Sequence, residues 1–237
     1  MIALIRIVTI FIYFILLNAT LVIAFILRPM HRDNVHLGAQ WYITMGRLIG
    51  LKLQMRISEK LKPEHSYLFI SNHQNTYDLV TVAAAALPGT VTIGKKSLKW
   101  IPVFGLIYWL SGNIMIDRKD KQSARDTLEA TAAKVNERNI SIFMFPEGTR
   151  SRGRGILPFK TGAFRLAQTT KKSIVPVVCS NTNHIELGRW NNGTVIVEIM
   201  DPVDIDFAEN PKTMAKTFEE LIRDKFATLS KEAKQLA

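Results

Sequence analysis

The chain opens with an apolar run that is long enough to cross a membrane. Residues 7–27 contain no charged side chain; Arg6 precedes them, and Arg28 and Arg32 follow. As a helix rising about 1.5 Å per residue, the run would be roughly 31 Å long, which matches the ~30 Å hydrocarbon core of a bilayer. The pattern predicts a membrane anchor rather than a cleaved signal peptide, because the run exceeds a typical signal and no A-x-A cleavage pattern follows it.

The residues after this run give an expected orientation and a second helix. Arg28 and Arg32 outnumber Arg6, and a basic flank favours the cytoplasmic side, so the rest of the chain is expected there. Residues 37–53 have apolar side chains near helical spacing. This second helix either folds back beside the first, as a hairpin within one leaflet, or packs on the domain as an amphipathic helix. The pattern favours neither arrangement.

From Ser66 onward, short apolar runs typical of strands alternate with stretches typical of helices. The strand candidates lack polar alternation, which indicates an α/β fold with a largely parallel or mixed sheet covered by helices. We therefore divide the chain into a membrane anchor of one helix or a helical hairpin, residues 1–60, and an α/β domain, residues 61–237. The strand candidates are residues 67–71, 90–93, 114–116, 140–145, 174–179 and 194–199, and the helix candidates are residues 78–86, 121–137, 161–170 and 211–234.

A second uncharged stretch, residues 100–116, is interrupted by a proline and two glycines, which argues against a helix that crosses the bilayer. Its aromatic residues Trp100, Tyr108 and Trp109 suit a membrane interface, and the three lysines in residues 95–99 would face anionic headgroups. The alternative is a buried helix and strand of the core, towards which the pattern leans slightly.

Composition and charge narrow the class of protein. The chain has 237 residues, 47% of them hydrophobic and 22% charged, which excludes a disordered chain. Its single cysteine, Cys179, excludes an intrachain disulfide, and no cluster with metal-ligand spacing occurs, so no metal is expected. The formal net charge of +11 is local: residues 94–125 hold seven basic and two acidic side chains, and residues 145–172 hold seven basic and one acidic. Such a local basic surface indicates an anionic partner.

The first candidate site follows the strand candidate at residues 67–71, where the chain reads Asn-His-Gln-Asn-Thr-Tyr-Asp. Ligands bind at the carboxyl ends of parallel strands, so this loop is well placed. A turn would bring Asp78 to one ring nitrogen of His73, fix the tautomer and leave the other nitrogen as a general base. Because no G-x-S-x-G motif occurs, His73 would act directly on a substrate hydroxyl that attacks an acyl group. The same spacing is common in helix caps, and the position at a strand end is what favours a catalytic pair.

The second candidate site follows residues 140–145, where Phe-Pro-Glu-Gly-Thr-Arg-Ser leads into a loop with two further arginines and Lys160. Glycines let backbone N–H groups approach oxygens closely, and guanidinium groups match phosphate geometry. The pattern is consistent with a cradle for an anion. A solvated turn has the same composition, and composition alone does not decide between the two.

Taken in order, these motifs resemble those of the glycerolipid acyltransferase family. N-H-x-x-x-x-D matches residues 72–78, G-x-I-x-I-x-R matches residues 112–118, F-P-E-G-T-R matches residues 145–150, and a V-P-V-like strand matches residues 174–177. The first and third motifs are specific, and no motif position departs from the pattern.

The resemblance implies transfer of a fatty acyl group from acyl-CoA or acyl-acyl carrier protein to the free sn-2 hydroxyl of lysophosphatidic acid, giving phosphatidic acid for phospholipid synthesis. No permanently bound cofactor is implied; the thioester is a substrate. His73 would be the general base, Asp78 would orient it, and Arg150 would bind the acceptor phosphate. The acceptor site would further contain Glu147, Gly148, Thr149, Arg118 and Lys95.

The resemblance also implies a location and partners. The protein is expected in the bacterial inner membrane, with the catalytic domain on the cytoplasmic side, an anionic membrane surface beneath it and acyl carrier protein as a partner. One alternative is a sibling acyltransferase with another lyso-lipid acceptor, and another is a non-catalytic basic membrane-binding protein. Nucleic-acid binding is not expected, because no known nucleic-acid motif or interleaved aromatic pattern occurs.

Overall fold

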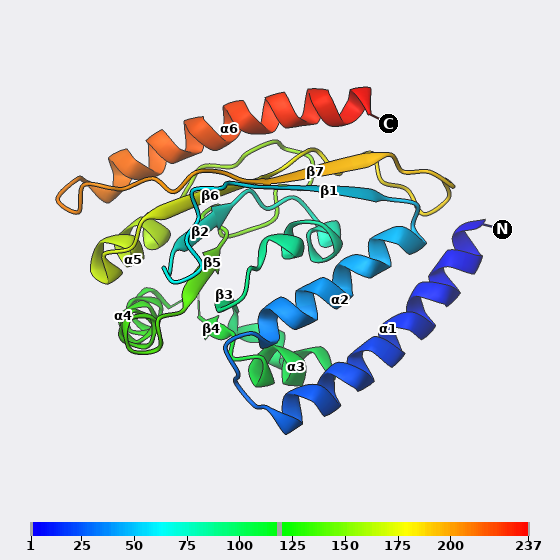
Figure 1. Ribbon diagram of the computed structural model, residues 1–237, viewed down its shortest axis with the longest axis horizontal. Coiled ribbons are helices and arrows are strands. Elements are labelled where there is room, and N and C mark those ends of the chain that lie inside the picture. The colour runs from blue at the N-terminus through cyan, green and yellow to red at the C-terminus, as the bar shows by residue number, and fades with distance from the viewer. Residues whose placement is uncertain (1, 118–119, 237) are drawn as a thin grey trace.

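The computed structural model describes residues 2–117 and 120–236, with the backbone alone at residues 121–125. The strands are β1 (Lys52–Ile57), β2 (Leu68–Ser71), β3 (Thr90–Lys95), β4 (Ile114–Ile116), β5 (Ser141–Met144), β6 (Ile174–Cys179) and β7 (Thr194–Ile199). They form one sheet in the order β1-β7-β6-β2-β5-β3-β4, in which only the β6–β7 pair is antiparallel (Figure 1). The predicted α/β class with a largely parallel or mixed sheet is confirmed.

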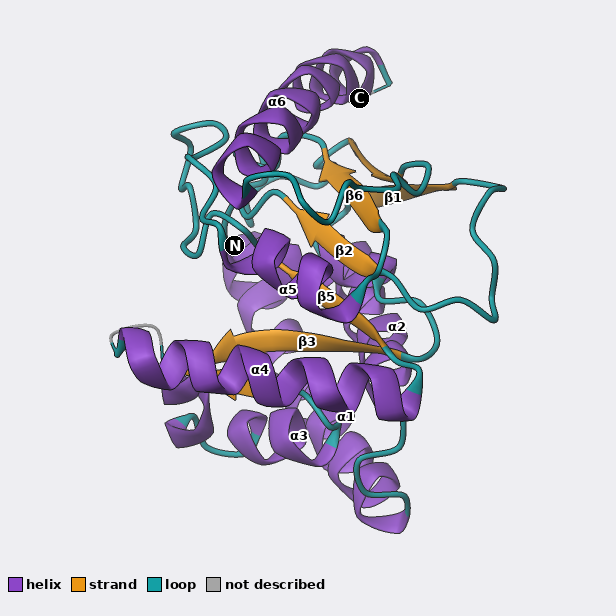
Figure 2. Ribbon diagram, turned by 90° about the vertical axis from the view of Figure 1, so that its left-hand side faces the viewer, coloured by secondary structure: helices purple, strands orange, loops and turns teal. Residues whose placement is uncertain are grey.

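Helices cover both faces of this sheet. The helices are α1 (Ile2–Leu27), α2 (Asn34–Leu48), α3 (Phe104–Leu110), α4 (Lys121–Arg138), α5 (Gly162–Thr170) and α6 (Pro211–Gln235), with short 3₁₀ helices η1 (Thr76–Val80), η2 (Val82–Ala85) and η3 (Lys96–Trp100). Figure 2 shows α5 in front of β2 and β5, and α4 in front of β3. On the other face, α2 lies between α1 and the sheet (Figure 1).

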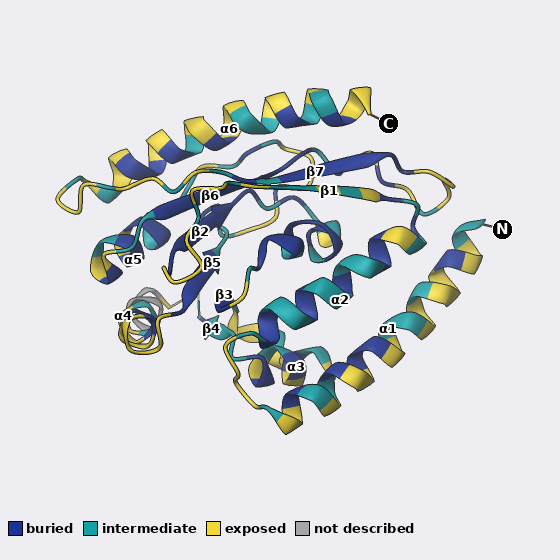
Figure 3. Cartoon of the chain, in the orientation of Figure 1, coloured by how far each residue is buried: buried dark blue, intermediate teal, exposed yellow. Residues whose placement is uncertain are grey.

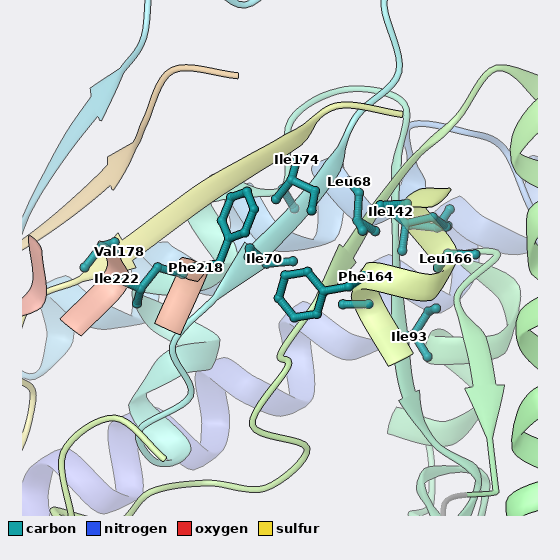
Figure 4. Packing of buried hydrophobic residues seen from close by; sticks show 14 of the residues in the cluster. Leu68, Ile70, Ile93, Ile142, Phe164, Leu166, Ile174, Val178, Phe218 and Ile222 are labelled. Atoms are coloured by element: carbon teal, nitrogen blue, oxygen red, sulfur yellow. The ribbon is translucent and has the colours of Figure 1, made fainter. Parts of the chain in front are cut away.

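Alternating side chains of the central strands fill two cores. Leu68 and Ile70 of β2 pack toward the α5 and α6 side, whereas Phe69, between them, packs in the cluster on the α2 side. This follows from the two-residue period of a strand, whose successive side chains point to opposite faces. Figure 4 shows Phe164 of α5 and Phe218 of α6 meeting beside β2, with ring centroids 5.7 Å apart. Both faces of the sheet are therefore buried at its centre, which fixes the strand ends that carry the polar loops.

The structure departs from the sequence prediction before residue 66. Residues 52–57, where no strand was predicted, form β1 and pair in parallel with β7. Gly50 ends the preceding helix with φ +71°, and a Cβ there would lie 2.0 Å from the carbonyl oxygen of Trp190. Only glycine fits this close approach, so the chain leaves α2 and enters the sheet on the anchor side of the boundary drawn at residue 60.

Two further segments differ in detail. Residues 78–86, predicted as one helix, are covered by η1 and η2, which is consistent with 3₁₀ helices being used in short pieces after a tight loop. Residues 100–116 contain α3 and β4, with Ile107 and Leu110 buried. Tyr108 is half-buried and its hydroxyl lies 2.7 Å from Oγ1 of Thr92, whereas Trp100 and Trp109 are exposed. The stretch therefore combines a buried side with an exposed aromatic one.

The N-terminal helix is long and apolar enough to cross a membrane, by length and composition only. It is held to α2 by polar contacts inside an apolar layer: the hydroxyl of Tyr42 donates to Oδ1 of Asn18 at 2.7 Å, and the side chains of Tyr13 and Thr44 lie 2.6 Å apart. Figure 3 shows exposed positions recurring along α1, most of them large apolar side chains. The second helix thus lies beside the first and also packs on the domain.

Candidate active site

The loop after β2 brings a histidine and a carboxylate into contact. Nδ1 of His73 lies 2.6 Å from Oδ2 of Asp78, and the backbone N–H of Gln74 donates to the same oxygen at 2.8 Å. Asp78 is buried in η1, and the His73 side chain is 18% exposed. Since the carboxylate accepts the proton on Nδ1, the other ring nitrogen, Nε2, keeps its lone pair. The sequence spacing correctly predicted this contact.

Amide side chains of the same loop tie it to the end of β6. The side chain of Asn72 accepts from the N–H of Cys179 at 2.9 Å and donates to its carbonyl at 3.0 Å. Gln74 donates to the carbonyl of Ser180 at 2.8 Å and accepts from the N–H of Thr182 at 3.0 Å. These bonds satisfy backbone groups that β6 leaves unpaired where it ends, so the loop is fixed by the sheet edge itself. Sequence analysis did not identify these roles, because they depend on β2 and β6 being neighbours.

Glu147, which follows β5, binds the backbone of His73 through its carboxyl group. Its Oε1 accepts from the N–H of His73 at 2.7 Å, and its Oε2 accepts from the N–H of Leu157 at 3.0 Å. The residue is only 2% exposed. Burial raises the pKa of this carboxyl to about 7, with the two N–H donors acting in the opposite direction and the charges of Asp78 and Glu219 adding to the rise. The carboxyl group therefore sets the position of both loops that it joins.

Further contacts complete the join between the two motif loops. The ring of His73 stacks on Phe145, with centroids 4.1 Å apart. The N–H of Ser151 donates to the carbonyl of His73 at 2.8 Å, and the N–H of Arg152 donates to the carbonyl of Gln74 at 2.9 Å. The histidine is consequently held on its ring face and through both of its backbone polar groups.

The arginine loop is held at its far end by the last helix. Glu219 of α6 accepts from the N–H of Phe159 at 3.1 Å, and Arg223 donates to the carbonyl of Ile156 at 3.1 Å. Glu219 and Arg223 also pair with each other at 2.8 Å. No sequence pattern pointed to this role of α6, whose residues lie about 60 positions from the loop they hold.

The predicted phosphate-binding residues lie on the same sheet edge. Arg150 is exposed beside the histidine loop, and its guanidinium donates to Oγ1 of Thr76 at 3.4 Å. Thr149 is exposed next to it, and Lys95 is exposed at the end of β3, the neighbour of β5. Arg118 lies outside the described residues.

Gly148 has a steric role in this loop. It adopts φ +69°, and a Cβ on it would lie 2.9 Å from Nζ of Lys160. A side chain would therefore be strained in backbone and would displace the lysine. Cys179, by contrast, is fully buried at the end of β6, and burial raises the pKa of its thiol, so it is a core residue as predicted.

Chemically, the arrangement combines a fixed imidazole with a cationic loop. The Nδ1–carboxylate contact stabilises the imidazolium that forms when Nε2 accepts a proton. The neighbouring arginines 150, 152 and 154 are exposed, and the guanidinium of Arg154 donates to the carbonyl of Ser151 at 2.8 Å. A cationic loop of this kind can bind an anion through the guanidinium groups of Arg150 and Arg152. A substrate that carries both a hydroxyl group and a phosphate matches these two features.

The comparisons with known proteins define the class. The family model described as Acyltransferase matches residues 52–180, and the chain belongs to this family.

The similar curated proteins point to one kind of acyltransferase within this family. The chain is 46% identical over 209 residues to the 1-acyl-sn-glycerol-3-phosphate acyltransferase of Haemophilus influenzae, covering 87% of each chain. It is 42% identical over 207 residues to the protein of the same name from Escherichia coli K12, covering 86% of this chain and 84% of that one. Among solved structures, the 1-acyl-sn-glycerophosphate (LPA) acyltransferase of Thermotoga maritima superposes with a TM-score of 0.70 at 22% identity, covering 96% of this chain and 97% of that one. That likeness supports the fold.

The buried carboxyl of Glu147 makes folding stability depend on pH in a defined direction. Its pKa is raised from 4.5 to about 7 by folding, so the folded protein keeps a proton that the unfolded chain releases between these values. The free energy of unfolding therefore falls as pH rises through this window, by about 1.4 kcal/mol per pH unit at most. Denaturant unfolding in detergent at pH 4.5 to 8 should show this fall in the wild type and its loss in Glu147→Gln. Glu59→Gln, at an exposed position, is the matched control. Parallel curves for the wild type and Glu147→Gln would contradict the prediction.

Proposed function

We propose that this protein is a 1-acyl-sn-glycerol-3-phosphate acyltransferase, which acylates the sn-2 hydroxyl of lysophosphatidic acid to give phosphatidic acid. The close curated relatives carry that name. The observation that best supports a mechanism is the contact between His73 and Asp78. It lies at the same edge of the sheet as the exposed guanidinium of Arg150. The donor is an acyl thioester, either acyl-CoA or acyl-acyl carrier protein.

In the proposed reaction, Nε2 of His73 accepts the proton of the sn-2 hydroxyl as its oxygen attacks the thioester carbonyl carbon. The new C–O bond forms, the C–S bond breaks, and the leaving thiolate takes up the proton from the imidazolium. Asp78 stabilises the imidazolium between the two transfers through its contact with Nδ1. A thioester is reactive enough for this step to need no permanently bound cofactor and no metal.

Arg150 is proposed to bind the acceptor phosphate, with Lys95 and Arg118 contributing positive charge. Its guanidinium donates to a threonine hydroxyl at 3.4 Å, a weak contact that a phosphate can replace with a charge-assisted pair. Gly148 and Thr149 shape the floor and rim of this site, and Glu147 positions it through Leu157. The basic loop also suits an acidic donor such as acyl carrier protein, which we propose as a partner.

The membrane arrangement follows from how α1 is fastened. The guanidinium of Arg6 donates to the carbonyls of Leu187, Arg189 and Trp190, the last at 2.8 Å, and lies 5.6 Å from the Trp190 ring centroid. At the other end, the N–H of Met30 donates to the carbonyl of Leu110 at 2.7 Å. A helix bound to the catalytic domain at both ends cannot carry one end to the opposite side of a bilayer. We propose that α1 lies in one leaflet, with the whole domain on the cytoplasmic side.

The assay of the general base uses purified protein in detergent with lysophosphatidic acid and acyl-CoA. His73→Ala should lower kcat by about 10²- to 10⁴-fold, because a general base typically contributes that much. His65→Ala, at an exposed position outside both motifs, should keep wild-type turnover. The measurement is the initial rate of phosphatidic acid formation, with the melting temperature as a check on folding. Near-full turnover in the His73 variant would remove the general base from the mechanism.

The phosphate site is tested with Arg150→Ala and Arg150→Lys. The alanine variant should raise the KM for lysophosphatidic acid roughly 10-fold or more, since charge-assisted bonds contribute about 1.5–3 kcal/mol. The lysine variant should recover part of this, because it keeps the charge and loses the bidentate geometry. Arg165→Ala, an exposed arginine on α5, is the matched control. If KM is unchanged in both Arg150 variants while His73→Ala is inactive, Arg150 does not bind the acceptor phosphate.

The single-leaflet arrangement is tested by thiol labelling, which the buried native cysteine does not disturb. Ala3→Cys, before Arg6, and Asn191→Cys, in the loop that Arg6 binds, should both resist a membrane-impermeant maleimide in intact spheroplasts. Both should react after the membrane is dissolved with detergent. Reaction of Ala3→Cys alone in intact spheroplasts would show that α1 crosses the bilayer.

A further inference from the structure

The segment η3–α3 presents apolar side chains to the outside. Trp100 is 76% exposed and Trp109 is 51% exposed, and three aliphatic side chains between them are also exposed. Soluble surfaces rarely gather so many large apolar side chains within ten residues. We call this set the apolar lip; it consists of Trp100, Ile101, Val103, Leu106 and Trp109.

The lip is a rigid feature, because its inner side is tightly packed. A Cβ on Gly105 would lie 2.6 Å from the carbonyl oxygen of Lys99, and a Cβ on Gly94 would lie 2.3 Å from the hydroxyl of Tyr108. Ile107 and Leu110 are buried on the same side. This inner packing fixes the backbone of the segment, and the backbone in turn directs the lip side chains outward.

One backbone conformation in the lip is costly and is nevertheless kept. Val103 has φ +62° and is more than half exposed. A β-branched residue with a positive φ is an outlier that costs of order 1–3 kcal/mol. The conformation begins α3 at a sharp turn and turns the valine side chain outward. A glycine at this position would remove the strain, but it would also remove an apolar side chain from the surface.

Charge and position show which partner fits. Lys95, Lys96 and Lys99 are exposed immediately before the lip, and Nζ of Lys99 lies 4.6 Å from the Trp100 ring centroid. Aromatic residues beside lysines are typical of a membrane–water interface with anionic headgroups. The helix α3, which carries part of the lip, also packs directly against α1 (Figure 1).

The lip stands at the edge of the sheet that carries the candidate active site. Lys95 ends β3, and β3 pairs in parallel with β5, whose end leads to Glu147. The carboxyl ends of parallel neighbours lie at one edge, so the lip rises from the same edge as the histidine loop.

We propose that the apolar lip is a second membrane-contacting element, separate from α1, that inserts into the anionic leaflet at the entrance of the active site. The lyso-lipid acceptor then enters from the bilayer beside the lip without passing through water. The kinetic part of this inference rests on the proposed function, whereas the contact with lipid does not.

Contact with lipid is measured by fluorescence at single cysteines, because native Cys179 is buried. Ile101→Cys and Leu106→Cys are labelled with an environment-sensitive fluorophore and reconstituted in vesicles of phosphatidylglycerol and phosphatidylethanolamine. Phe207→Cys is the matched control, an exposed apolar position on the loop before α6, which Figure 1 places across the sheet from α3. We expect a blue-shifted emission and quenching by nitroxide-labelled acyl chains at positions 101 and 106 only. Emission and quenching equal to those at position 207 would overturn the proposal.

Substrate entry is measured with the combined variant Trp100→Ser, Ile101→Ser and Leu106→Ser. For a long-chain acceptor diluted in vesicles, the apparent KM as a surface fraction should rise about 10-fold, since each lost apolar contact weakens insertion. For a short-chain acceptor dissolved as a monomer, kcat/KM should stay within about 2-fold of wild type. Equal loss with both acceptors would assign the lip to the active-site structure instead of the bilayer.

Two other outcomes separate the hypotheses. A change from oligomer to monomer on mutation, without lipid quenching at positions 101 and 106, would identify the lip as a contact between copies of the chain and overturn the proposal. Inactivity of the wild type toward both acceptors would contradict the proposed function, and the fluorescence result would still decide whether the lip meets the bilayer.

Discussion

The buried carboxyl group of Glu147 makes the two contacts on which the geometry of the site depends. Its two oxygens accept the backbone N–H groups of His73 and Leu157, so the loop after β2 and the loop after β5 share one acceptor group. Loss of that group would leave two partly buried N–H donors unpaired, at up to about 1–3 kcal/mol each. The base and the cationic loop are thus set relative to each other through main-chain atoms, independently of any substrate.

The last helix extends this arrangement. Glu219 and Arg223 hold the loop just beyond Leu157, and the charge of Glu219 also contributes to the raised pKa of Glu147. A site assembled from one short loop would move with that loop. Here the positions are determined by elements from both halves of the chain, which suits a reaction whose donor and acceptor must meet in one fixed orientation.

Local sequence patterns predicted the features of the fold that depend on residues close together in the chain. The apolar runs predicted six strands, and the five-residue spacing predicted the contact between His73 and Asp78. What depends on tertiary pairing was not predictable. In β1, polar and apolar residues alternate as on an edge strand. That pattern does not indicate which strand β1 pairs with, and its parallel pairing with β7 is known only from the structure. Likewise, Asn72 and Gln74 have a role only because β6 lies next to β2.

The hydrogen bonds of Arg6 affect the order in which the protein can fold during synthesis. Its partners, the carbonyls of residues 187–190, are more than 180 positions away in the sequence. The N-terminal helix leaves the ribosome well before these partners, and its binding site is completed only after most of the sheet has been synthesised. Closure of so long a loop is slow compared with helix formation. The contacts of Arg6 can therefore form only after the loop at residues 187–190 has been made, so they close the N-terminal helix onto the domain late in folding.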